Sequence, residues 1–306
     1  MDAIQGPLRE LRDLIVGLAQ GRPRVEMLDG VNVGVMPHPT EPTGTYTAPS
    51  LTVVAQGVKQ TELNGRTYDY RAGQYLVASL ALPVTGKVLH ATAHEPFAAL
   101  SIALDRTVIA DLLAASVPVR TAGTELAAMA VSDTGPDLLD PVLRLLRLAQ
   151  SPADLAALGA GVRREVLWRL LRGEQGALVR QIGLADGRLA SVARVARFIR
   201  DHYDEPLSIA RLAEQAGMSS ASLHRHFRAA TSMTPLQYQK AIRLQEARAL
   251  ILANGREIAE VGYLVGYESP SQFSREYRRR FGDSPRNDRH RVGHPGYQDY
   301  QGYQSA

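Results

Sequence analysis

The C-terminal third of the chain contains an internal repeat, and this feature limits the possible folds more than any other. Each copy opens with a five-residue segment suited to a short amphipathic helix, at residues 209–213 and 258–262. Gly217 and Gly266 follow at matching places, 49 residues apart, and then come Ser219 and Ser269, 50 residues apart. Self-similarity at a fixed spacing predicts two copies of one small helical unit.

Each copy has a direct physical interpretation. The glycine permits the left-handed backbone of a tight turn and ends the first helix, and the serine after it caps the next helix. Pro270, at the first position of that helix in the second copy, strengthens this prediction. The following side chains then match in pairs: Leu223 with Phe273, Arg225 with Arg275, Phe227 with Tyr277, Arg228 with Arg278, and Thr234-Pro235 with Ser284-Pro285.

These matched positions predict a helix-turn-helix in each copy. Leu223 and Phe227 are four residues apart and form one buried stripe, whereas Arg225 falls between them and faces away. A short helix, a turn with glycine and a capped helix with an outward arginine are typical of DNA-binding helix-turn-helix units. The alternative is an ordinary helical hairpin in a bundle, but two copies in register favour DNA binding.

Charge is distributed unevenly along the chain. Residues 1–186 hold 17 Lys and Arg against 19 Asp and Glu, whereas residues 187–290 hold 17 Lys and Arg against 11 Asp and Glu. Sixteen of the latter 17 cations are Arg, whose planar fork matches phosphates and guanine edges. A basic segment on a slightly acidic body is typical of a nucleic-acid-binding domain.

The phrase EIAEVGYLVGYESPSQFSREY at residues 257–277, with FGDSP at residues 281–285, is similar to the signature of the AraC/XylS transcription regulators. The resemblance extends over residues 189–285. It implies two helix-turn-helix units joined by a long helix, here residues 235–253, with recognition helices at residues 220–229 and 270–280. In that family the two recognition helices enter successive major grooves on one face of DNA.

The same resemblance implies which side chains meet DNA. The base-reading positions correspond to Ala221, Ser222 and Arg225 in the first unit and to Ser271, Gln272 and Arg275 in the second, and Arg228 and Arg278 complete the expected DNA-binding set. The sequence departs from the family pattern at two places. Gly262 replaces the more usual alanine, and polar residues 286–291 replace an apolar closing helix, so we expect a loose terminal turn.

The first hundred residues predict a helix followed by short strands. Residues 6–20 carry leucines at helical spacing. Extended runs follow at residues 51–55, 58–63, 66–70, 74–82, 86–93 and 97–104, with Asn64-Gly65 as a hairpin turn and Pro83 as a strand break. Residues 33–113 resemble the cupin-like N-terminal domain of one subgroup of these regulators, which implies a small β-barrel. The predicted class is therefore α+β, with flanking helices on the barrel and an all-α double helix-turn-helix domain.

Helices are expected again at residues 105–115, 137–150 and 153–172. An apolar stripe on the second of these contains Leu138, Val142, Leu145 and Ala149. It fits burial on the barrel and a dimer seam equally well. Residues 183–187 suit a linker. We expect an effector-sensing and dimerisation domain at residues 1–183, a DNA-binding domain at residues 184–290 and a disordered tail at residues 291–306.

An enzyme is the main alternative, because cupin barrels also hold metal-dependent oxygenases. The nearby ligand candidates are His38, Glu41, His90, His94 and Glu95, and they lack the His-x-His, Glu and distant His of a cupin metal site. The chain has no Cys, which excludes a thiolate metal site and a thiol nucleophile. Gly57, Gly65 and Gly73 suit hairpins rather than a phosphate loop. We therefore expect no catalytic residue, no cofactor and no metal.

The expected partners follow from these assignments. They are double-stranded DNA, a small-molecule effector in the barrel, RNA polymerase and a second copy of the chain as a homodimer. One alternative remains open, a front domain that only dimerises. The barrel argues against a second, an architectural DNA binder that senses nothing, because such a protein needs only the basic domain. No stretch approaches the roughly 18–20 apolar residues of a membrane helix, so we expect a cytoplasmic protein with no membrane partner.

Overall fold

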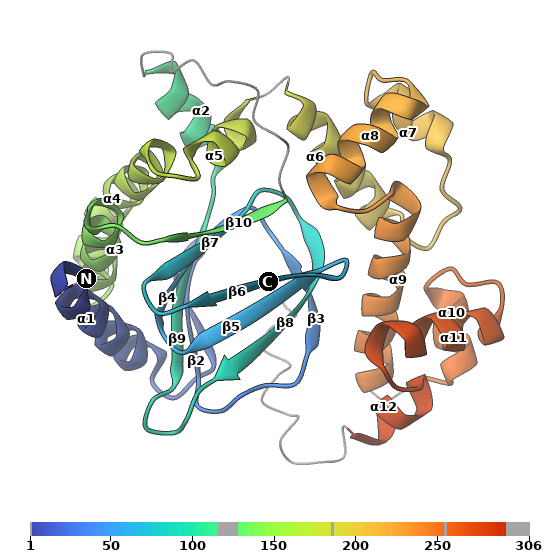
Figure 1. The fold of residues 1–306 in the computed structure, drawn as a ribbon, viewed down its shortest axis with the longest axis horizontal. Helices are drawn as coiled ribbons and strands as arrows, with labels where there is room; N and C mark the ends of the chain where they lie inside the picture. Colours follow the sequence, from blue (N-terminus) through green and yellow to red (C-terminus); the bar gives the residue numbers. More distant parts are fainter. Residues whose placement is uncertain (1, 116–127, 185–186, 254–255, 292–306) are drawn as a thin grey trace. The chain divides into compact units, whose positions relative to one another are not determined.

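The computed structural model describes residues 2–115, 128–184, 187–253 and 256–291 (Figure 1). The chain divides into two compact units, Met1–Ala190 and Ser191–Ala306. Across the described ranges, no helix combines the length and the apolar character needed to cross a bilayer. The predicted disordered tail at residues 291–306 lies, apart from its first residue, outside the described residues.

The N-terminal unit begins with helix α1 (Asp2–Ala19), which ends where Gln20 and Gly21 take positive φ. The strands that follow are β1 (Arg24–Leu28), β2 (Val31–Met36), β3 (Thr43–Thr47), β4 (Ser50–Gln56), β5 (Val58–Leu63), β6 (Arg66–Arg71), β7 (Gln74–Ala78), β8 (Leu82–His90), β9 (Phe97–Ala103) and β10 (Met129–Asp133). They form one sheet in the order β1-β2-β9-β4-β7-β10 and another in the order β3-β8-β5-β6. The predicted α+β class is confirmed, although the strands form two antiparallel sheets rather than one closed barrel.

The hairpin prediction at Asn64-Gly65 is confirmed. Asn64 and Gly65 have φ of 50° and 83°, and β5 pairs with β6 from Leu63 opposite Arg66. The two positive φ values are those that a type I′ turn requires, and the twist of that turn matches the twist of the flanking strands.

Pro83 does not break a strand, contrary to our prediction. The run predicted at residues 74–82 ends earlier, with β7 at Ala78, and Pro83 lies inside β8. It is paired with Tyr46 of β3, while β5 pairs with β8 only from Thr85 onward. Proline has no backbone N–H to donate to a neighbouring strand. It is therefore tolerated near the start of a strand, where one side of the strand has no partner.

The remaining helices of this unit are α2 (Arg106–Ala114), α3 (Pro136–Leu148), α4 (Pro152–Arg172) and α5 (Gly176–Gly183). Helix α3 packs against α1 and α4 (Figure 1). Leu138, Val142 and Leu145 of its apolar stripe are buried there, and Arg144 donates to Glu165 of α4 at 2.5 Å. These three side chains are therefore covered within one copy of the chain, whereas Ala149, the fourth member of the stripe, is half-buried.

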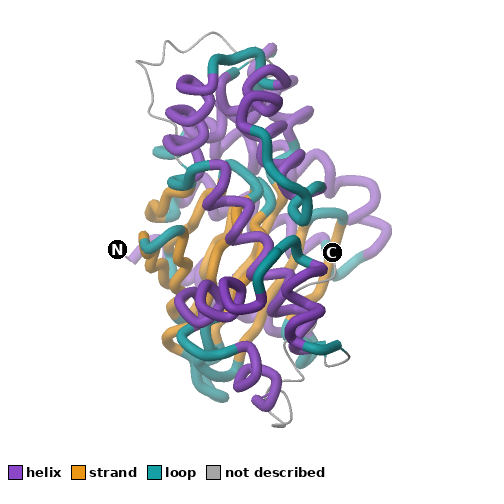
Figure 2. Tube along the Cα trace, turned by 90° about the vertical axis from the view of Figure 1, so that its right-hand side faces the viewer, coloured by secondary structure: helices purple, strands orange, loops and turns teal. Residues whose placement is uncertain are grey.

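In the described residues of the C-terminal unit all regular secondary structure is helical, and loops join the helices (Figure 2). Its helices are α6 (Arg188–Asp201), α7 (Ile209–Gln215), α8 (Ser220–Thr231), α9 (Pro235–Leu252), α10 (Ile258–Leu264), α11 (Pro270–Phe281) and α12 (Pro285–Arg291). The recognition helices and the long joining helix end within two residues of their predicted bounds.

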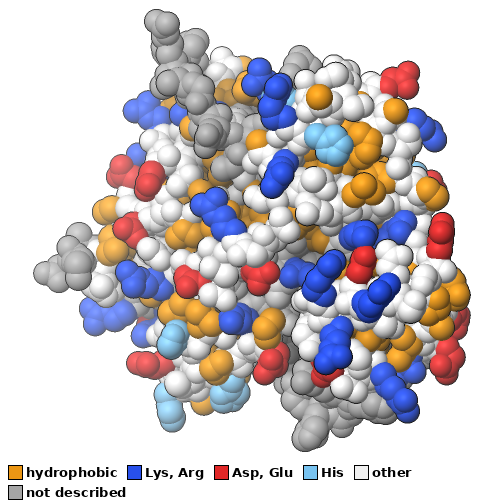
Figure 3. Space-filling view, turned by 45° about the vertical axis from the view of Figure 1, so that its right-hand side comes forward, with side chains coloured by type: hydrophobic (Ala, Val, Ile, Leu, Met, Phe, Trp, Pro, Cys, Tyr) orange, Lys and Arg blue, Asp and Glu red, His pale blue; other side chains and the backbone are white. Residues whose placement is uncertain are grey.

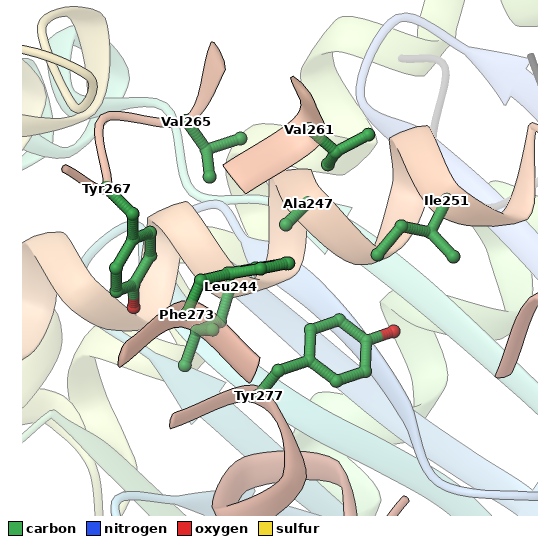
Figure 4. Close-up of a cluster of buried hydrophobic side chains, with 8 residues drawn as sticks. All are labelled: Leu244, Ala247, Ile251, Val261, Val265, Tyr267, Phe273 and Tyr277. Atoms are coloured by element: carbon green, nitrogen blue, oxygen red, sulfur yellow. The ribbon is translucent and has the colours of Figure 1, made fainter. Parts of the chain in front are cut away.

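The second half of this unit has its own core, in which α9, α10 and α11 meet (Figure 4). The buried side chains are Leu244, Ala247, Ile251, Val261, Val265, Tyr267, Phe273 and Tyr277. The rings of Phe273 and Tyr277 meet edge to face with centroids 5.6 Å apart. Burial of each large side chain stabilises the fold by about 1.5–3 kcal/mol, so this core holds α11 in place while the opposite side of α11 stays exposed.

Candidate nucleic-acid interface

The first helix-turn-helix is formed by α7 and α8. Gly217 follows α7 with φ of 64°, and the Ser219 hydroxyl accepts the N–H of Ser222 at 3.2 Å, capping α8. Leu223 and Phe227 of α8 are completely buried, and Phe227 packs edge to face on Tyr238 of α9. The predicted turn, cap and buried stripe are confirmed in this copy.

The second helix-turn-helix, α10 and α11, repeats this construction. Gly266 has φ of 87°, and the Ser269 hydroxyl accepts the N–H of Gln272 at 3.4 Å. A Cβ on Gly266 would lie 2.3 Å from the carbonyl oxygen of Asp204, so glycine is required here for space as well as for conformation. The equivalent Gly217 has open space around it.

The two recognition helices expose the same positions. Over residues 221–229 and 271–279 the order of buried, half-buried and exposed residues is identical. The predicted site residues fall into two groups in this pattern: Ala221, Arg225, Arg228, Ser271, Arg275 and Arg278 are exposed, and Ser222 and Gln272 are half-buried. Each set is therefore accessible along one side of its helix, as a groove-reading helix requires.

The four arginines of this set are available to an outside partner. Among the residues that the structure describes, Arg225, Arg228, Arg275 and Arg278 have no ion pair. Figure 3 shows several Lys and Arg side chains close together on the surface of the C-terminal helices. Exposed guanidinium groups without an ion pair attract phosphates, and their binding releases counterions from DNA.

A carboxylate that the sequence analysis overlooked organises the second recognition helix. Glu276 of α11 accepts hydrogen bonds from Lys240 at 2.7 Å, from the Tyr267 hydroxyl at 2.9 Å and from the Gln272 amide at 3.2 Å. Burial by itself raises the pKa of Glu276, but these donors outweigh it and hold the pKa below its ordinary value of 4.5. The spacing of four between Gln272 and Glu276 was a sequence signal for their contact.

A second unpredicted group is the guanidinium of Arg243 on α9. Its nitrogens donate to the carbonyl oxygens of Tyr203 at 2.6 Å, Glu205 at 3.0 Å and Gly266 at 2.6 Å. Burial lowers the pKa of Arg243. Two of these carbonyls lie in the connection between α6 and α7, and the third lies in the turn between α10 and α11. Arg243 therefore fixes the orientation of one helix-turn-helix relative to the other.

The loose terminal turn that we expected after Pro285 is instead a docked helix, α12. Asp288 of α12 is buried, and its carboxylate receives Arg248 at 3.1 Å and the Tyr277 hydroxyl at 2.8 Å. Arg248 also lies over the Phe281 ring at 4.7 Å. A buried ion pair and a hydrogen bond thus hold α12 against α9 and α11.

The rejected metal candidates do not come together. His90 ends β8, and His38 and His94 lie outside the strands. Within the described ranges, no three His, Asp or Glu side chains are grouped so that they could share a metal ion.

Comparison with known proteins gives two family matches. The family described as the AraC-type transcriptional regulator N-terminus matches residues 27–178, and the family described as a helix-turn-helix domain matches residues 212–291. The transcriptional activator RhaS of Salmonella agona is 30% identical over 153 residues, which are 49% of this chain and 54% of RhaS. RhaS of Salmonella typhimurium matches with the same values. The chain thus spans about half the length of the curated relatives it matches.

Solved structures show a similar fold. Wild-type ToxT of Vibrio cholerae with a bound unsaturated fatty acid has a TM-score of 0.56 at 9% identity, covering 90% of this chain and 97% of ToxT. An apo ToxT variant has a TM-score of 0.53 at 8% identity, covering 86% of this chain and 98% of ToxT. At such identities the similarity concerns the fold alone.

Proposed function

The chain belongs to the AraC-type transcriptional regulators, and from this premise we propose that α8 and α11 read double-stranded DNA in two successive major grooves. The observation that carries the proposal is the identical pattern of exposure on the two helices. Two helices with different burial would present unrelated surfaces, whereas these present an arginine at the same place in each copy.

The roles of the site residues follow from their side chains. Arg225 and Arg275, near the centre of each exposed side, suit the bidentate contact with the N7 and O6 of guanine. Arg228 and Arg278 lie one turn further along and suit phosphate contacts, which position a protein without reading sequence. The shorter members of the set, nearer the start of each helix, are assigned to base edges: Ala221, Ser222, Ser271 and Gln272.

Arg225→Ala and Arg275→Ala test this assignment in the full chain. Each should relax preference at one base step and cost about 1–3 kcal/mol of discrimination. Arg9→Ala is the matched control, because Arg9 is exposed on α1 and its loss removes the same charge from the N-terminal unit. Binding to a selected duplex and to its single-base variants is measured by fluorescence anisotropy. A uniform loss over all bases would move the arginine to the phosphate-contacting group.

We propose further that the N-terminal unit binds a small-molecule effector. The match of residues 27–178 to the AraC-type N-terminus supports this, as does the fatty acid bound to ToxT. A groove of about 680 Å³ in this unit is lined by aromatic and charged side chains, including Tyr75, Trp168, Arg169 and Arg172. Its volume lies within the range of small-molecule sites.

Thermal unfolding of the full chain against a metabolite panel that includes an unsaturated fatty acid tests the effector proposal. A ligand at about a hundred times its dissociation constant stabilises the folded state by about 2.7 kcal/mol. If no metabolite raises the melting temperature, the result favours the second candidate function, in which the N-terminal unit only dimerises. Sedimentation of the full chain tests the proposed homodimer. The activator name of the RhaS relatives supports RNA polymerase as a further partner, and we assign no catalytic activity.

A further inference from the structure

Two helices of the C-terminal unit begin with the same sequence pattern but use it differently. Thr234-Pro235-Leu236-Gln237 opens α9, and Ser269-Pro270-Ser271-Gln272 opens α11. In α9 the Thr234 hydroxyl accepts the N–H of Gln237 at 3.2 Å, and the Gln237 side chain accepts the N–H of Thr234 at 2.9 Å, which completes a capping box.

In α11 only the first half of this exchange is formed. The Ser269 hydroxyl accepts the N–H of Gln272, but the Gln272 amide nitrogen donates to Glu276 at 3.2 Å. The residue four positions after the glutamine explains the difference, since α9 has Ala241 there and α11 has Glu276. Gln237 of the same chain thus shows that a glutamine at this position closes the capping box when no carboxylate lies four residues later.

Two donors other than Gln272 fix the position of the Glu276 carboxylate. Its side chain is 13% exposed, and Lys240 and the Tyr267 hydroxyl donate to its two oxygens. A carboxylate accepts hydrogen bonds and does not donate them. The amide nitrogen of Gln272 must therefore face Glu276, which fixes the orientation of the amide. Among the described residues, the oxygen and the second N–H of this amide have no hydrogen-bond partner.

We propose that Glu276 is a positioning residue for base recognition: it withdraws Gln272 from the capping box and orients its amide to read adenine. An acceptor oxygen beside a donor N–H is the pair that a glutamine uses against the N6 and N7 of adenine. Glu276 itself touches no base in this account. The inference rests on the proposed function, since it requires α11 to lie in a major groove.

The test compares base preference among variants of the full chain. A preferred duplex is selected from a randomised library, and binding is measured for that duplex and for the three other bases at each position. Gln272→Ala should reduce the preference for adenine at one position by about 5- to 150-fold. Glu276→Ala should reduce it at the same position by a similar factor, because Gln272 then returns to the capping box, as Gln237 does beside Ala241.

Further variants separate positioning from folding. Glu276→Met keeps the length of the stem and removes the acceptor, so it should behave as Glu276→Ala even if the alanine variant folds poorly. Glu276→Gln keeps a carbonyl acceptor and should retain most of the preference. Glu260→Ala is the matched control, because it removes an exposed carboxylate from the neighbouring α10 and should leave the base ratio unchanged.

The outcomes distinguish this inference from the function on which it rests. If Gln272→Ala relaxes the preference and neither Glu276→Ala nor Glu276→Met does, Glu276 is not a positioning residue. If Gln272→Ala leaves the preference unchanged, Gln272 reads no base, and both its assignment and this inference are wrong. A purely structural role of Glu276 would weaken binding to all four bases equally and would also overturn the proposal.

Discussion

Gly217 and Gly266 occupy equivalent turns in different surroundings, so alanine at each position applies one backbone change to two environments. Both glycines have positive φ, of 64° and 87°. An L-residue in the left-handed region costs about 1–2 kcal/mol. Since a Cβ on Gly217 meets nothing within 4 Å, this conformational cost of about 1–2 kcal/mol is the whole effect expected there.

Gly266→Ala carries a further cost that the structure locates. The new Cβ would lie 2.3 Å from the Asp204 carbonyl oxygen and 2.7 Å from the Arg243 guanidinium carbon. Relief of this overlap has to move Arg243 away from the carbonyl oxygens of Tyr203 and Glu205. A hydrogen bond from a charged donor contributes about 1.5–3 kcal/mol, so the loss of two brings the total to about 4 kcal/mol or more.

Urea denaturation of the full chain measures both variants. Far-ultraviolet circular dichroism follows the helices, and fluorescence of Trp168, the single tryptophan of the sequence, follows α4 in the N-terminal unit. The dichroism transition should move to much lower urea in Gly266→Ala than in Gly217→Ala, while the Trp168 transition stays in place. Equal shifts in the two variants would refute the role given to the contacts of Asp204 and Arg243.

Two further predictions concern buried charges of the C-terminal unit. Asp288→Ala leaves Arg248 largely buried without its carboxylate partner and should lower the free energy of unfolding by about 3 kcal/mol. Urea denaturation measures this loss. A loss below about 1 kcal/mol would show that α12 contributes little to stability. Because the pKa of Glu276 is lower in the folded state, its contribution to stability is complete above pH 4.5 and is lost as the pH falls through the folded-state pKa. Glu276→Gln should flatten this acid-dependent loss in an acid titration of stability, and an unchanged pH profile would contradict the assignment.

The elements of the C-terminal unit could be predicted because their signals are local. Gly217 and Ser219 act on their own neighbours in the chain, and the spacing of Leu223 and Phe227 places both on one side of α8. No distant residue is needed to interpret such signals, so the turns, the caps and the helix bounds follow from the sequence. Which positions α8 and α11 expose is settled by the same spacing.

Contacts between distant segments could not be predicted in this way. The stripe of Leu138 and Val142 indicates burial but not the covering surface, since another helix of the same chain and a second copy satisfy the same pattern. Asp288 appears as one polar residue in a polar run, and only the fold brings Arg248 and Tyr277 to it. The strand containing Pro83 was misjudged because pairing on one side only becomes visible when the sheet order is known.

Selection of duplexes from a randomised library by the full chain is the direct test of whether α8 and α11 read two successive major grooves. We expect two blocks of base preference whose centres lie roughly 10–10.5 bp apart, one for α8 and one for α11. Binding should also weaken steeply with salt, because phosphate contacts release counterions. A selected pool with a single short block, or with no enriched sequence at all, would contradict the reading of two successive major grooves.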